Sequence, residues 1–274
     1  MSYLSNEAED APIVVCLHGF PDLPRTWAPL TEVFRDEGYH VVCPWLPGYA
    51  PSSLEGPFDP PALARAFLSF VEELSPIEPV RVVGHDWGSL IAQCALAQWP
   101  ERFRAAALLA FPHTLAFEEN IKEHPRQLGR SAYMGLFQLP FLSDRLVELH
   151  DFAFIERLWR KWSPGFDPGE DYFDELKLCL RSSMPAPLKY YRALRSPKTF
   201  RETRQLLSSG PIVVPTIYLH GERDGCVGPE IAEEQGAHFS ALFDQIMLAD
   251  AGHFVHLERP ALVNEAIVEW FRTY

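Results

Sequence analysis

Six short apolar runs, each ending in turn residues, limit what this chain can fold into more than any other feature of the sequence. They are residues 12–17, 40–45, 80–83, 105–111, 215–219 and 243–248. Runs of this length with few polar positions are typical of parallel strands that are buried on both faces of a sheet.

Helical patterns lie between several of these runs. Apolar residues recur at helix spacing at Trp27, Leu30, Val33 and Phe34, at Leu63, Phe67, Val71 and Leu74, and at Val263, Ile267, Trp270 and Phe271. The alternation of strands and helices predicts an α/β fold with a doubly wound, mostly parallel sheet of about six strands. In such a sheet, loops at the carboxyl ends of the strands form the functional site.

Between residues 113 and 208 the strand signal disappears and helical faces replace it. This segment therefore reads as a helical lobe inserted between two strands. We expect a first core part at residues 1–112, a helical cap at 113–208 and a second core part at 209–274.

Charge and composition limit the partners of the chain. Its 274 residues include 24 Lys and Arg against 37 Asp and Glu, which gives a net charge of −13. This charge repels phosphate backbones and anionic lipids, so we expect no nucleic acid and no membrane partner. The acidic start lacks the apolar segment of a signal peptide, and the five scattered cysteines suggest neither disulfides nor a zinc site. A reducing cytoplasm fits these features.

The strand at 80–83 runs into Gly84-His85-Asp86-Trp87-Gly88, and a helical stretch follows. This pattern is typical of a strained strand-to-helix turn that exposes a nucleophile, with Asp86 where Ser is more usual. The alternative role for Asp86 is to cap the helix. Ser89 lies three positions beyond the nucleophile's slot, which argues against it as the nucleophile.

In the same type of fold an acid and then a His follow the nucleophile along the chain. Asp224 follows the run at 215–219, and His253 follows the run at 243–248. We expect His253 to act as general base and Asp224 to orient it, with Glu222 and Asp250 as rivals for Asp224.

Two further features lie near these positions. The first strand ends in His18-Gly19-Phe20-Pro21-Asp22, where the backbone N–H groups of Phe20 and Trp87 can form an oxyanion hole. We expect His18 to stabilise the turn and Asp22 to cap a helix. His256 with His253 suggests a metal pair, but no third ligand has suitable spacing, so we expect no metal.

These motifs resemble those of the epoxide hydrolases of the α/β-hydrolase fold, and the resemblance covers almost the whole chain. It rests on His18-Gly19-Phe20-Pro21, Trp45-Leu46-Pro47-Gly48-Tyr49, Gly84-His85-Asp86-Trp87-Gly88, the Asp224 loop and Gly252-His253. Haloalkane dehalogenases share the same motifs. Residues 1–11 are too few for the antiparallel strand pair that usually opens this fold, so the resemblance implies a shortened N-terminus.

Two segments of the expected cap resemble those that carry tyrosines in epoxide hydrolases. Tyr133 precedes Phe137-Gln138-Leu139-Pro140, and Tyr191 lies in Lys189-Tyr190-Tyr191-Arg192, where the family has Asn-Trp-Tyr-Arg. The resemblance implies that two phenols bind the epoxide oxygen, with Tyr190 left open as an alternative to Tyr191. Each tyrosine could instead be an aromatic residue of the cap core.

The resemblance thus implies a cofactor-free enzyme that opens a small apolar epoxide with Asp86 and releases the diol with water. Aromatic residues of the cap, among them Phe137 and Trp159, suggest an apolar substrate pocket. The alternatives are a haloalkane dehalogenase and a non-catalytic ligand-binding protein of the same fold. The sequence leaves monomer and homodimer open.

Overall fold

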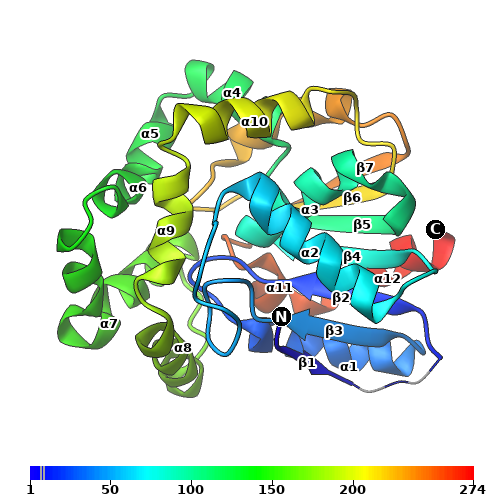
Figure 1. Cartoon of the computed structure of the whole chain (residues 1–274), viewed down its shortest axis with the longest axis horizontal. Coiled ribbons are helices and arrows are strands. Elements are labelled where there is room, and N and C mark those ends of the chain that lie inside the picture. The colour runs from blue at the N-terminus through cyan, green and yellow to red at the C-terminus, as the bar shows by residue number, and fades with distance from the viewer. Residues whose placement is uncertain (7, 9) are drawn as a thin grey trace.

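The computed structural model describes residues 1–6, 8 and 10–274 (Figure 1). Its described strands form one seven-stranded sheet in the order β1-β3-β2-β4-β5-β6-β7. The strands are β1 (Tyr3–Ser5), β2 (Ile13–Leu17), β3 (His40–Pro44), β4 (Val80–His85), β5 (Phe103–Leu109), β6 (Thr216–Gly221) and β7 (Phe243–Leu248). The neighbours from β3 to β7 are parallel, as the short apolar runs predicted.

The sheet has one strand more than the six expected from the sequence. The additional strand, β1, pairs antiparallel with β3 at the edge of the sheet, with Leu4 opposite Cys43. A strand of three residues is too short to show a periodic pattern. Its side chains are also poorly buried, with Tyr3 47% and Leu4 45% exposed, so no apolar run marks it.

Helices cover both faces of the sheet, and this explains why the central strands are apolar throughout (Figure 1). In β2, Val15 and Leu17 join the core cluster that contains α2 (Pro60–Leu74) and α3 (Trp87–Gln98). Val14 and Cys16 join the cluster that contains α1 (Ala28–Asp36) and α12 (Pro260–Thr273).

The segment between β5 and β6 is helical and lies to one side of the sheet (Figure 1). Its helices are α4 (Thr114–Glu123), α5 (Arg126–Arg130), α6 (Ala132–Phe137), α7 (Leu142–Trp162), α8 (Glu170–Ser183), α9 (Ala186–Ala193) and α10 (Pro197–Leu207). Helix α10 contacts α2 and α3, so the segment is packed on the core helices.

The remaining elements are short. They are α11 (Val255–Glu258) and the 3₁₀ turns η1 (Pro24–Trp27), η2 (Pro100–Arg102), η3 (Pro229–Ala232) and η4 (Gln235–His238). In the described part of the chain, no helix combines the length and the apolar character needed to cross a lipid bilayer.

Candidate active site

Asp86 lies on a strained turn between β4 and α3. Its backbone has φ 51° and ψ −114°, in a region that L-residues rarely adopt. A Cβ on Gly84 would lie 2.5 Å from the carbonyl oxygen of Gly88, and a Cβ on Gly88 would lie 2.2 Å from that of Leu17. Only glycine therefore fits at both positions. The Asp86 side chain makes no capping bond to α3, which removes the helix-cap alternative.

Three side chains from separate loops meet at this turn. His253 Nδ1 lies 2.8 Å from Asp224 Oδ2, and His253 Nε2 lies 3.6 Å from Asp86 Oδ2. The other oxygen of Asp224 accepts the backbone N–H groups of Cys226 and Val227 at 2.6 and 2.9 Å. Because the Asp224 carboxylate can only accept, Nδ1 of His253 carries a proton and Nε2 faces Asp86.

The alternative candidates for the acid and for the nucleophile lie elsewhere. Asp250 accepts a bond from Arg223 at 2.5 Å on the surface, where its side chain is 60% exposed. The backbone N–H of Glu222 bonds to Leu248, and its side chain is exposed. Ser89 is buried in α3 and donates to the carbonyl oxygen of Phe111 at 2.9 Å.

The two carboxylates control the charge of His253. Burial lowers its pKa, but Asp224 and Asp86 outweigh this and raise the pKa to about 10. For Asp224, burial raises the pKa, whereas His253 and His220 draw it below its ordinary value. The imidazole is therefore protonated at neutral pH, beside the charged carboxylate of Asp224.

The predicted oxyanion donors lie beside Asp86. The backbone N–H of Phe20 donates to Asp86 Oδ1 at 2.8 Å. Trp87 is the first residue of α3, where the backbone N–H has no acceptor within the helix. His18 stabilises the turn, since its Nδ1 lies 2.8 Å from the carbonyl oxygen of Gly19 and its Nε2 accepts the N–H of Leu46 at 3.2 Å.

Tyr133 of α6 and Tyr191 of α9 lie next to each other, with ring centroids 5.6 Å apart. The Tyr133 hydroxyl is 3.6 Å from Cys226 Sγ, and that of Tyr191 has no hydrogen-bond partner among the described residues. Tyr190 instead donates to the carbonyl oxygen of Pro47. Burial is the main cause that raises the pKa of both Tyr133 and Tyr191, so both phenols keep their protons.

A cavity of about 520 Å³ connects these groups, a volume suited to a drug-sized molecule. Asp86, Trp87, Tyr133, Tyr191 and Cys226 lie on its wall, and most other lining residues are apolar.

Phe137 and Trp159 are not among the residues that line this cavity, which corrects the expectation that they form the pocket. The Phe137 ring packs behind it, 5.1 Å from the ring of Tyr191. Trp159 stacks on Phe254 and donates to the carbonyl oxygen of Pro21 at 2.9 Å. Both side chains belong to the packed core and not to the cavity wall. Residue type alone cannot distinguish a core position from a cavity-wall position, because large apolar side chains occur at both.

Comparison with known proteins decides the family. The family model for the alpha/beta hydrolase fold matches residues 12–260. The chain belongs to the α/β-hydrolase-fold family. This confirms the fold class expected from the sequence.

Individual members of the α/β-hydrolase-fold family resemble the chain over most of its length. Human "Epoxide hydrolase 4" is 26% identical, with 97% of this chain and 74% of the relative covered. "Epoxide hydrolase 3" of Xenopus tropicalis is 27% identical, covering 98% and 74%. The solved structure of an epoxide hydrolase from Bacillus megaterium has a TM-score of 0.86 at 22% identity, covering 99% and 96%. These names agree with the resemblance that the sequence motifs indicated.

Sequence reasoning missed the role of the backbone of Trp162, at the end of helix α7 in this α/β-hydrolase-fold protein. Its carbonyl oxygen accepts the backbone N–H groups of Gly225 and His253, each at 3.0 Å. A Cβ on Gly252 would lie 2.7 Å from the same oxygen. One backbone oxygen of the helical segment thus fixes both the loop that carries Asp224 and the loop that carries His253.

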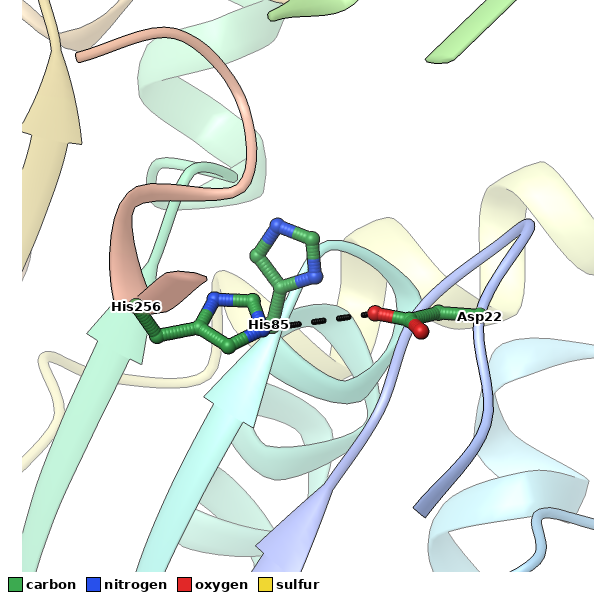
Figure 2. Close-up of side chains that lie close together, drawn as sticks. All are labelled: Asp22, His85 and His256. Carbon is green, nitrogen blue, oxygen red and sulfur yellow. Dashed lines mark ion pairs between the residues drawn. The ribbon is translucent and has the colours of Figure 1, made fainter. Parts of the chain in front are cut away.

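A second buried cluster lies behind the site, formed by Asp22, His85 and His256 (Figure 2). The positions of these three residues along the sequence do not predict that they lie together. Asp22 is not a helix cap: its Oδ1 accepts the N–H of Leu23 and the hydroxyl of Tyr172 in α8. Its Oδ2 lies 4.0 Å from His256 Nε2. Burial raises the pKa of Asp22 to about 7.

His85 joins this cluster to the catalytic loop. Its Nε2 lies 2.9 Å from the carbonyl oxygen of His253, which can only accept, so Nε2 carries the proton. Burial lowers the pKa of His85 to about 3, so the ring is neutral. His85 therefore supports the loop of His253 as an uncharged donor.

Proposed function

We propose that this chain hydrolyses epoxides to vicinal diols through a covalent ester on Asp86. The observation that carries the proposal is that a carboxylate and two protonated phenols line one apolar cavity, with a His-Asp pair beside the carboxylate. The names of the curated relatives support the same activity.

In the first step, an oxygen of Asp86 attacks a carbon of the epoxide, and the bond from that carbon to the ring oxygen breaks. The departing oxygen gains negative charge, which the hydroxyls of Tyr133 and Tyr191 stabilise as donors. Since the Tyr191 hydroxyl has no partner among the described residues, it can donate to the substrate without losing another bond.

In the second step, Nε2 of His253 takes a proton from a water molecule that attacks the ester carbonyl. The N–H groups of Phe20 and Trp87 stabilise the oxyanion. Collapse of the intermediate breaks the bond from the carbonyl carbon to the substrate oxygen, and this oxygen takes the proton of the newly formed carboxyl group. The diol then leaves, and Asp86 is again a carboxylate.

The charge of His253 links the two steps. In the resting enzyme Asp86 helps to raise the pKa of His253 to about 10, so the imidazole holds a proton. Formation of the ester removes the negative charge of Asp86, and with it one of the interactions that raise this pKa. The imidazolium then gives up its proton, which neutralises the alkoxide held by the two phenols, and the neutral imidazole can act as a base in the second step.

Dehalogenation is the alternative reaction for the same nucleophile. A departing halide needs no proton and can be bound by an indole N–H, such as that of Trp87. Two neutral phenols beside the nucleophile favour an epoxide, because an alkoxide needs strong donors. A purely ligand-binding protein would have no use for the pairing of His253 with Asp224.

The test is to trap the ester. His253→Gln should react with styrene oxide and gain one substrate mass, located on the peptide that contains Asp86. The matched control His253→Gln/Asp86→Asn should gain none. Label on another peptide, or no label with an epoxide that the unaltered enzyme hydrolyses, contradicts the mechanism. Release of halide from 1-bromobutane, with no diol from a panel of epoxides, would identify a dehalogenase.

Three further features belong to this proposal. Residues 113–208 act as the cap that carries both phenols, and the core consists of residues 1–112 and 209–274. Small apolar epoxides and water are the substrates, and no cofactor takes part. The described cysteines are free thiols, which supports a reducing compartment such as the cytoplasm.

A further inference from the structure

Cys226 brings a thiol into the catalytic cavity. Its Sγ, a carboxylate oxygen of Asp86 and a ring nitrogen of His253 all lie within 4.8 Å of one another. Cys226 and Asp86 line the cavity. Nε2 of His253, which faces Asp86, is buried and has no hydrogen-bond partner among the described residues. Three different donor groups therefore lie close together, and two of them, Asp86 and Cys226, line the cavity.

These donors are the ones that zinc prefers. Zn²⁺ binds thiolate, imidazole and carboxylate in tetrahedral geometry, with metal–ligand distances of about 2.0–2.3 Å and donors roughly 3.3–3.8 Å apart. The 3.6 Å between Asp86 Oδ2 and His253 Nε2 fits this spacing as it stands. Cys226 Sγ lies no more than 4.8 Å from either of the other two donor atoms.

A metal ion that binds Cys226 has to displace the proton of the thiol, and the resulting thiolate then holds the metal.

We propose that Zn²⁺ binds to Asp86, Cys226 and His253 and reversibly blocks the active site. Binding releases the proton of the Cys226 thiol and the proton on Nε2 of His253, and water takes the fourth position. The metal then occupies the nucleophile and the base together. The inhibition, though not the binding, rests on the epoxide hydrolase activity proposed above.

The cluster of Asp22, His85 and His256 does not offer an equivalent site. None of its three residues lines the cavity, whereas Asp86 and Cys226 do. Nε2 of His256 is also hydrogen-bonded to Thr26 Oγ1 at 2.5 Å.

Cobalt binding tests the site directly, because Co²⁺ takes the place of Zn²⁺ and its spectrum reports both thiolate coordination and tetrahedral geometry. The unaltered enzyme should bind one Co²⁺ with a thiolate charge-transfer band, and Zn²⁺ should displace it. Cys226→Val and Cys226→Ser should lose the band and bind Zn²⁺ at least about 100-fold more weakly in calorimetry, since one of three protein donors is gone. Cys179→Val, which removes a half-buried thiol elsewhere, is the matched control and should bind as the unaltered enzyme does.

Three outcomes overturn the proposal: no Co²⁺ binding, a cobalt spectrum without the thiolate band, or equal Zn²⁺ affinity in the Cys226 variants. The spectra do not depend on catalysis. A bound, thiolate-ligated metal in a protein that turns over no epoxide would support the zinc site and contradict the proposed reaction. If Zn²⁺ leaves epoxide hydrolysis unchanged, the result would support the proposed reaction and contradict the zinc site.

Discussion

Replacing Asp224 with Asn should stop the second half of the reaction and spare the first. One oxygen of Asp224 accepts the N–H groups of Cys226 and Val227, at 2.6 and 2.9 Å, and the other accepts Nδ1–H of His253 at 2.8 Å. In the variant, only the amide oxygen of Asn can accept hydrogen bonds from the two backbone N–H groups. Its NH₂ group then faces Nδ1 of His253, which has to become an acceptor.

The tautomer of His253 follows from this exchange. With Nδ1 as the acceptor, the proton of the neutral ring lies on Nε2, the atom that has to take a proton from water. In Ser-His-Asp triads the same substitution lowers kcat by about 10⁴, which corresponds to about 5 kcal/mol of lost transition-state stabilisation. We expect a similar loss for ester hydrolysis. Attack by Asp86 needs no base, so ester formation should slow by no more than about tenfold.

Rapid quenching followed by intact-protein mass measurement separates the two steps. Asp224→Asn should accumulate the Asp86 ester to nearly one equivalent within the first turnover and release diol very slowly. Asp250→Asn is the matched control, because that carboxylate pairs with Arg223 on the surface and should be replaceable without effect. If Asp224→Asn breaks the ester down at the rate of the unaltered enzyme, the assignment of Asp224 as the orienting acid is wrong.

Three other results are expected. Asp86→Asn should lower the pKa of His253 from about 10, because one of the two negative charges beside the imidazole is lost. NMR titration of the ring would measure this pKa. An unchanged value would contradict the effect of the Asp86 charge on His253. His85 has a pKa of about 3 when folded and an ordinary value of 6.5 when unfolded, so the unfolded state gains protons first and stability falls as pH decreases. At pH 5 this lowers the free energy of unfolding by about 2 kcal/mol. In His85→Gln the amide can replace the Nε2 donor. Denaturant unfolding of this variant should therefore show a smaller decrease in stability between pH 7 and pH 5 than the unaltered protein does. Gly88→Ala should lower the free energy of unfolding by about 3 kcal/mol or prevent folding, since the new Cβ meets a backbone oxygen at 2.2 Å, whereas Gly129→Ala, with open space around it, should not.

Much of the fold was readable from the sequence because buried parallel strands leave uninterrupted apolar runs. The nucleophile turn was readable for a different reason: the spaces beside Gly84 and Gly88 exclude every larger residue. The order of Asp86, Asp224 and His253 along the chain then predicted which loops meet, and the structure brings these three side chains together.

What the sequence could not supply depends on how distant elements pack. Tyr190 and Tyr191 are neighbours, and only the way α9 lies on the core decides that Tyr190 bonds to Pro47 while Tyr191 faces the cavity. Asp22 looked like a helix cap because its partner, Tyr172, is 150 residues away. Local patterns contain no information about such pairs.

The carbonyl oxygen of Trp162 has a consequence for enzyme engineering. It holds the loops of Asp224 and His253 through two N–H bonds, although it belongs to the segment whose other helices shape the cavity. Grafting that segment from another enzyme would exchange the substrate-facing wall and the scaffold of the catalytic pair together. Selectivity and catalytic alignment are therefore not separable modules in this chain unless a graft ends before α7 or preserves the backbone path through Trp162.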